Sequence, residues 1–240
     1  MTYHFDTLTS TNDEARKSTY VDMDVIWADM QSAGRGQRGH TWLSNKGENL
    51  TFSVVLEPLF LEASKQFLLS EITALSIYEM LYEYGIKSKI KWTNDIYVDN
   101  RKITGILIEH QLSGNFLRRT ILGVGIDVNQ VCFPQTLPNP TSMKLQSGHS
   151  FSLEQVLEKF MICLRRNYDS IRRGDFQTIQ SKYHNLLYRL DERHRFMAED
   201  GKFFYGIIRG VRPYGALIVE NDSGQQKEYQ FKEIEFVLSD

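Results

Sequence analysis

The fold is decided by the stretch from Lys91 to Glu109, which reads KWTNDIYVDNRKITGILIE. Two runs rich in β-branched and aromatic residues flank Asp99-Asn100, a pair that is typical of a two-residue turn. We therefore expect an antiparallel hairpin here. It belongs to a longer strand-rich stretch that extends from Lys89 to Val128.

The hairpin predicts which side chains share a face. Side chains alternate by two along a strand, so a turn at Asp99-Asn100 pairs Tyr97 with Lys102 and Asp95 with Thr104. Asp95 and Lys102 are then diagonal neighbours about 7–8 Å apart. A carboxylate that can hold Mg²⁺ beside an ammonium that can hold a phosphate is a workable nucleotide site. A surface salt bridge on a hairpin is an equally good interpretation of these two residues alone.

A second informative segment is Ser32 to His40, SAGRGQRGH, in which Gly34 to Gly39 matches G-x-G-x-x-G. A dinucleotide-binding fold needs a helix directly after these glycines, but the chain continues into TWLSNKGEN, so that fold is excluded. No GxxxxGK[ST] motif occurs. Arg35 and Arg38 among small residues favour a loop that wraps an anionic ligand through main-chain amides and charged hydrogen bonds. A flexible surface loop is the alternative.

The remaining pattern predicts an α+β fold: a mixed sheet flanked by helices, followed by a small all-β unit. After Asp191 the chain reads as short strands separated by turn residues, which suits a small barrel. We expect a catalytic domain over residues 1–190 and a barrel over 191–240. Further strands are predicted at Tyr3–Leu8, Asp24–Gln31 and Asn49–Glu57, and helices at Ser10–Ala15, Glu62–Tyr84, Ser152–Ile171 and Asp175–Arg189.

Composition bounds the function. The 240 residues carry 28 basic and 30 acidic side chains, which argues against a broadly cationic nucleic-acid binder. Cys132 and Cys163 are too far apart in sequence to suggest a metal site or a disulfide framework. The N-terminus has no signal-peptide pattern and the apolar runs are too short to span a bilayer. We therefore expect a cytoplasmic protein without membrane contact.

Four motifs in order resemble the biotin–protein ligase family, of the monofunctional type without an N-terminal DNA-binding domain. They are Ser10-Thr11-Asn12, Gln31 with GRGQRG and Trp42, the lysine stretch already quoted, and GVGIDVN from Gly123 to Asn129. Together they cover Tyr3 to Asn129. The resemblance implies a mixed-sheet catalytic domain, and GVRPYGALIVENDSG near the C-terminus is similar to the SH3-like barrel that closes family members.

The resemblance also implies roles for individual residues. Catalysis would rest on Lys102, Arg35 and Lys91. Asp95 would hold Mg²⁺, and Gly125 would allow close backbone approach to the ligand. Biotin would be bound by Ser10, Thr11, Gln31, Gly34, Arg35, Trp42, Lys102, Gly105 and Gly123, and the nucleotide by Gln37, Arg38, Lys91, Asn94, Asp95, Asp127 and Asn129. The family often carries Arg at position 37, Pro at 93 and Asn at 127, where this chain has Gln37, Thr93 and Asp127.

The implied activity is ATP-dependent activation of biotin to biotinyl-5′-AMP, and transfer of biotin to a lysine of a biotin carboxyl carrier domain of a carboxylase. The substrate carboxylate is itself the nucleophile, so no catalytic Ser or Cys is needed. The rival hypotheses are a lipoate or octanoate ligase or transferase, a non-catalytic ligand binder, and a biotin-responsive DNA-binding repressor. Fewer than ten residues precede Ser10, so we expect no DNA-binding module and no nucleic-acid partner. A monomer and a homodimer both stay open.

Overall fold

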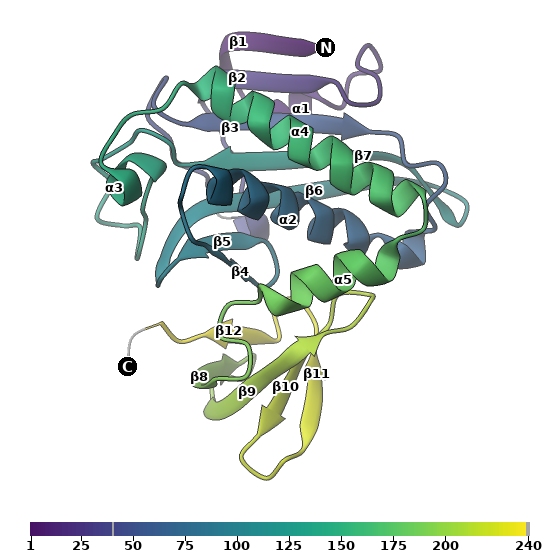
Figure 1. Ribbon diagram of the computed structural model, residues 1–240, viewed down its shortest axis with the longest axis vertical. Coiled ribbons are helices and arrows are strands. Elements are labelled where there is room, and N and C mark those ends of the chain that lie inside the picture. The colour runs from purple at the N-terminus through teal and green to yellow at the C-terminus, as the bar shows by residue number, and fades with distance from the viewer. Residues whose placement is uncertain (40, 239–240) are drawn as a thin grey trace.

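The computed structural model describes residues 1–39 and 41–238, without the side chain of Arg38. Its centre is a seven-stranded sheet in the order β1-β2-β3-β7-β6-β5-β4 (Figure 1). β1 pairs with β2 in parallel, and every other neighbouring pair is antiparallel. The strands are β1 (Thr2–Leu8), β2 (Val25–Gln31), β3 (Leu50–Leu56), β4 (Lys89–Lys91), β5 (Asp95–Val98), β6 (Arg101–Ser113) and β7 (Phe116–Ile126).

Helices cover one face of this sheet. In Figure 1, α2 (Phe67–Glu83) and α4 (Leu153–Arg172) lie in front of the strands, and α5 (Phe176–Asn185) lies below them. The α4 helix begins where Ser152 accepts a hydrogen bond from the amide of Gln155, as an N-cap residue does. The apolar stripe of α4 packs on the largely buried α2, and both contribute to one hydrophobic core with the sheet.

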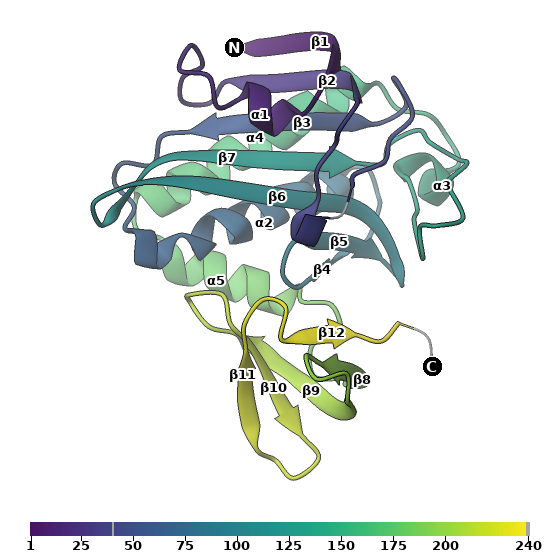
Figure 2. The same ribbon diagram turned by 180° about the vertical axis from the view of Figure 1, so that it is seen from behind.

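The opposite face of the sheet carries the ligand motifs. Figure 2 shows α1 (Thr11–Glu14) lying on this face, and the segment between β2 and β3 crossing it. That segment contains a short 3₁₀ helix, η1 (Gln37–Gly39), which lies next to β5 and β6 in the figure. Two further short helices are η2 (Ala63–Lys65) and α3 (Met143–Ser147).

The C-terminal strands form a second, antiparallel sheet in the order β11-β10-β9-β8-β12. They are β8 (Arg193–Ala198), β9 (Phe203–Val211), β10 (Leu217–Asn221), β11 (Gln226–Tyr229) and β12 (Ile234–Phe236). The α+β class with a mixed sheet, flanking helices and a small all-β unit is thus confirmed. The sheet is open among the described residues, so closure into an SH3-like barrel stays a prediction.

Two local predictions were wrong. The pair Tyr97–Lys102 is present, but Asp95 faces Gly105 and not Thr104, because β6 carries one extra residue between the paired positions. At this bulge the backbone of Lys102 bonds instead to Asn139 and Thr141. The helix predicted over Asp175–Arg189 is also shorter, since α5 ends at Asn185. None of the described helices is long and apolar enough to cross a membrane.

Candidate active site

A polar cluster lies at one end of the motif-bearing face. The backbone amide and the hydroxyl of Thr11 both donate to Oε1 of Gln31, at 2.7 and 3.1 Å. This fixes the Gln31 amide with its Nε2 group as the remaining donor. Ser10 is the N-cap residue of α1, yet its hydroxyl makes no capping bond, and the residue is 3% exposed. Several hydrogen-bonding groups therefore converge here without being consumed by the helix end.

A glycine platform lies beside this cluster. Gly105 on β6 and Gly125 on β7 are directly paired across the sheet, and the indole of Trp42 covers both. A Cβ atom on Gly105 would lie 3.0 Å from the Trp42 ring, and one on Gly125 only 2.3 Å from it. The glycines are required because any side chain here would occupy the space that the indole fills.

The cationic part of the site lies on the hairpin. The ammonium of Lys102 lies 2.7 Å from Oδ1 of Asp95, and that of Lys91 lies 4.0 Å from Oδ2 of the same carboxylate. Lys91 also lies 4.8 Å from the ring centre of Phe236, in the C-terminal sheet. The cations are therefore held close together by one carboxylate and an aromatic ring, in a position to receive an anion.

Two cavities meet at these groups. The first encloses about 470 Å³ and includes the polar cluster and the glycine platform. The second encloses about 1150 Å³ and extends from the hairpin cations to the C-terminal sheet. Their lining residues overlap, so one ligand can extend from the polar cluster to the cations. The residues shared by both cavities are Gly36, Gln37, Trp42, Asn94 and Lys102.

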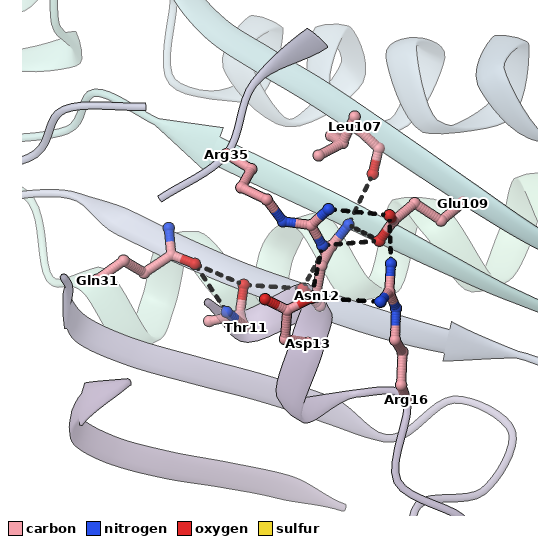
Figure 3. A network of polar contacts seen from close by, with 9 residues as sticks. Thr11, Asn12, Asp13, Arg16, Gln31, Arg35, Leu107 and Glu109 are labelled. Atoms are coloured by element: carbon pink, nitrogen blue, oxygen red, sulfur yellow. Dashed lines mark hydrogen bonds and ion pairs between the residues drawn. The ribbon is translucent and has the colours of Figure 1, made fainter. Parts of the chain in front are cut away.

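The guanidinium of Arg35 is turned toward carboxylates (Figure 3). It lies 2.7 Å from Asp13 and 3.2 Å from Glu109, and Arg16 bonds the same Glu109 at 2.7 Å. Burial alone raises the pKa of the Glu109 carboxyl, but the hydrogen bond from Asn12 and the arginine charges outweigh it and lower the pKa overall. Glu109 is thus an ionised anchor for the glycine-rich loop.

The structure brings most of the predicted site residues together. Gly34 does not line the first cavity but lies against its wall, because a Cβ there would lie 3.1 Å from Nε2 of Gln31. The first cavity is lined by the predicted residues Ser10, Thr11, Gln31, Arg35, Gln37, Trp42, Asn94, Lys102, Gly105, Gly123 and Gly125, and the second adds Lys91 and Asp95.

Two predicted nucleotide residues are not among the residues that line either cavity. Asp127 is buried with Oδ1 unpartnered in the described chain. Burial raises the pKa of its carboxyl well above its ordinary value, and the nearby Lys102 opposes this only in part. Asn129 is engaged with the backbone of Phe151 through both side-chain atoms, at 2.8 and 2.9 Å. The side chain of Arg38, and His40 as a whole, lie outside the described residues.

Other residues at the site were missed from the sequence. Ser53 lies 2.6 Å from Asn12 Oδ1, and Asn12 donates to Glu109. Glu109 could have been found by alternation, because it follows Gly105 by four residues on β6 and so shares its face. No sequence signal placed Phe236 at the site, or the bond from the Trp92 indole to the Gly215 carbonyl at 2.8 Å. These contacts come from the C-terminal sheet.

Comparisons with known proteins agree with this geometry. Residues 3–127 match the model of the biotin/lipoate A/B protein ligase family. The bifunctional ligase/repressor BirA of Bacillus subtilis is 30% identical over 95% of this chain and 71% of its own length. The biotin–[acetyl-CoA-carboxylase] ligase of Paracoccus denitrificans is 30% identical over 90% of this chain and 93% of its own.

The fold has solved counterparts. The biotin protein ligase of Aquifex aeolicus in complex with biotin and ATP superposes with a TM-score of 0.84 at 26% identity, covering 99% of both chains. The chain spans 64% and 62% of the ligase/repressor relatives from Bacillus spizizenii and Salmonella typhimurium. With its four motifs gathered around one pair of joined cavities, the chain belongs to the biotin/lipoate A/B protein ligase family.

Proposed function

We propose that this protein uses ATP to activate biotin as biotinyl-5′-AMP and then transfers biotin to a lysine of a biotin carboxyl carrier domain. The observation that carries the proposal is the position of Lys102 in the wall shared by the two cavities. One cavity offers neutral donors and acceptors that suit a ureido ring. The other offers cations that suit phosphates.

Biotin enters the first cavity in this proposal, with its ureido ring at Ser10, Thr11 and Gln31. A site built from hydrogen-bonding groups rejects ligands that lack them, because its own polar atoms would be left unpaired. Lipoate and octanoate have no ureido group, so the polar cluster favours biotin over both. Trp42, Gly34, Gly105, Gly123 and Gly125 shape the remainder of this cavity.

The biotin carboxylate then reaches Lys102, beside the cavity for ATP. The carboxylate attacks the α-phosphorus and pyrophosphate leaves. The protein supplies orientation and neutralises the charge that grows on the phosphate oxygens. Lys102, Lys91 and Asn94 take this role, each charged hydrogen bond contributing about 1.5–3 kcal/mol. In this proposal Arg35 anchors the loop through its ion pairs with Asp13 and Glu109.

Magnesium fits the second cavity as a companion of the nucleotide. The described residues contain no cluster of three or more His, Cys, Asp or Glu side chains that could form a metal cage. Mg²⁺ bound to nucleotides commonly uses one or two carboxylates and substrate phosphates. Asp95 and Glu235 are the carboxylates that line this cavity, and in this proposal Asp95 holds the ion. When bound, the ion would neutralise phosphate charge.

The test separates the acids that members of this family could use. The purified protein is incubated with ATP, a carrier domain and biotin, lipoate or octanoate, and pyrophosphate release and the mass of the carrier are measured. We expect pyrophosphate release that depends on biotin, and a mass increase equal to one biotinyl group. Modification by lipoate or octanoate without biotin would overturn the proposal.

Further parts of the proposal concern organisation and partners. We place the boundary between the catalytic domain and the C-terminal unit between residues 190 and 191, just before the second sheet begins with β8 at Arg193. The net charge of −2 supports action on a protein acceptor without a nucleic-acid partner. Two widely separated free cysteines fit a reducing cytoplasm. A gel-shift titration with duplex DNA tests whether the protein has a nucleic-acid partner. Sedimentation distinguishes a monomer from a homodimer.

A further inference from the structure

A third cavity opens on the same junction. It encloses about 580 Å³ between the start of α2, the strand β6 and the turn of the C-terminal sheet that carries Tyr214. Gln37 and Asn94 line this cavity as well as both others. The site is therefore a three-way junction, and the proposed function accounts for two of its branches, one for biotin and one for ATP.

The third branch differs from the others in charge. The first cavity is lined in part by Arg35 and Lys102, and the second by Lys91 and Lys102. The ten described residues that line the third include no lysine, arginine, aspartate or glutamate. His110, its one ionisable imidazole, has a pKa lowered by burial, which favours the neutral ring. Among the described residues, an approaching amine meets no fixed positive charge on this path.

The walls also match the shape of a lysine side chain. Phe67, Ile106 and Ile108 supply apolar surface for a flexible four-carbon stem. Burial among apolar groups favours the neutral form of an amine over the ammonium, and the neutral amine is the nucleophile. At the inner end, the Oε1 atom of Gln37 is buried and accepts no hydrogen bond from the described residues. It can accept one from an incoming N–H group.

From this geometry we propose that the third cavity is the channel through which the acceptor lysine reaches the acyl carbon. The inference rests on the proposed function and identifies the binding site of its second substrate. The amine nitrogen forms a bond to the acyl carbon, the bond from that carbon to the phosphate oxygen breaks, and AMP leaves with the electron pair. One proton is released to water. The amine enters by a path that neither biotin nor AMP occupies.

The test uses a substitution that narrows the third cavity and leaves the lining of the other two unchanged. Ser70 on α2 lines the third cavity and neither of the others, so Ser70→Leu fills it. Ser70→Ala is the conservative variant. Ser64→Leu is the matched control, since Ser64 is exposed on η2 and lines none of the three.

Three single-turnover rates are measured for each protein: formation of enzyme-bound biotinyl-AMP, transfer to the carrier domain, and aminolysis by n-butylamine. In Ser70→Leu we expect the first to stay within about twofold, while both amine reactions slow by at least about tenfold. Ser70→Ala and Ser64→Leu should resemble the wild type.

Every other outcome contradicts either the channel or the proposed function. Equal slowing of all three rates, or unchanged amine reactions in Ser70→Leu, overturns the channel. Slowing of the carrier reaction with normal n-butylamine aminolysis also overturns it, because the substitution would then act on the docking of the carrier. A wild-type protein that forms no adenylate refutes the proposed function itself, which is a distinguishable result.

Discussion

The ammonium of Lys102 lies 2.7 Å from the carboxylate of Asp95, although the two residues are seven positions apart across a hairpin. In this structure Asp95 occupies the position that an anionic substrate group would take beside the lysine. Because Lys102 is 33% exposed and Asp95 only 16%, the lysine can exchange this partner for a ligand. The pair therefore holds the cation at the wall that the two cavities share.

Replacement of Lys102 by alanine should abolish adenylate formation. The loss of one charged contact to the reacting carboxylate and phosphate costs about 1.5–3 kcal/mol. More than one such contact is lost here, so pyrophosphate release should fall at least about a hundredfold. The melting temperature should change little, since an ion pair of this exposure contributes about 0–1 kcal/mol.

Lys202→Ala is the control, because that lysine is exposed in the C-terminal unit. Pyrophosphate release by Lys102→Ala at the wild-type rate would remove Lys102 from the chemistry.

Replacement of Glu109 by glutamine tests the anchoring of the glycine-rich loop. The loop is then held less often in the conformation that binds biotin, and the apparent affinity falls by the same fraction. We expect the KM for biotin to rise by about three- to tenfold, the effect of a lost ion pair of about 1 kcal/mol, with kcat nearly unchanged.

Arg16→Gln provides the comparison, since it removes the other cationic partner of Glu109 and leaves the contacts of Arg35 intact. If Arg35 instead served the nucleotide phosphates, its release in Glu109→Gln would lower the KM for ATP.

The glycine platform can be tested by adding one methyl group. In Gly125→Ala the new Cβ would lie 2.3 Å from the Trp42 ring, so the indole must move. Overpacking of this kind costs about 1–3 kcal/mol, and we expect a lower melting temperature together with a higher KM for biotin. In the double variant with Trp42→Ala, the added stability cost should nearly vanish, while biotin binding stays weak. Additive losses of stability would show that the two residues do not share this space.

The parts of the site that could be predicted from the sequence are those formed by local interactions. The hairpin, the glycine-rich loop and the polar cluster carry turn, glycine and capping signals within short windows, and their convergence was expected from the family resemblance. The bulge beside Lys102 was not predictable, because it depends on bonds to Asn139 and Thr141, some forty residues away in sequence. Beside it, the ammonium of Lys102 and Oδ1 of Asp95 lie 2.7 Å apart.

The contribution of the C-terminal sheet was invisible for a similar reason. The short strands after residue 191 were recognisable from turn residues, but nothing in them indicated which turn would meet the catalytic domain. Nothing in the lysine stretch predicted that the Trp92 indole donates to the carbonyl of Gly215, in the turn between β9 and β10. Such long-range contacts are set by packing and not by local propensity.

A final prediction concerns Glu71, which lies in the core on α2 and outside the three cavities. Its Oε2 atom and the hydroxyl of Tyr183 on α5 are both buried without a hydrogen-bond partner in the described chain. Burial raises the pKa of the Glu71 carboxyl from 4.5 to about 8. The pKa of Glu71 is higher in the folded chain than in the unfolded one. Below pH 4.5 the carboxyl is therefore largely neutral in both states and does not lower the free energy of unfolding. Stability is then lost progressively as the pH rises through about 8, since the unfolded chain ionises freely and the folded one does not.

Glu71→Gln removes this ionisation while keeping the shape of the side chain. At pH 8 its free energy of unfolding should exceed that of the wild type by several kcal/mol, because each unit by which burial raises the pKa of Glu71 costs about 1.4 kcal/mol once the unfolded chain is ionised. At pH 4.5 the two proteins should differ little. Urea unfolding followed by circular dichroism across this range measures the difference. A constant offset between the two proteins at every pH would show that Glu71 does not titrate in the fold, whereas a gap that widens between pH 4.5 and 8 requires a carboxyl held neutral by its burial in the core.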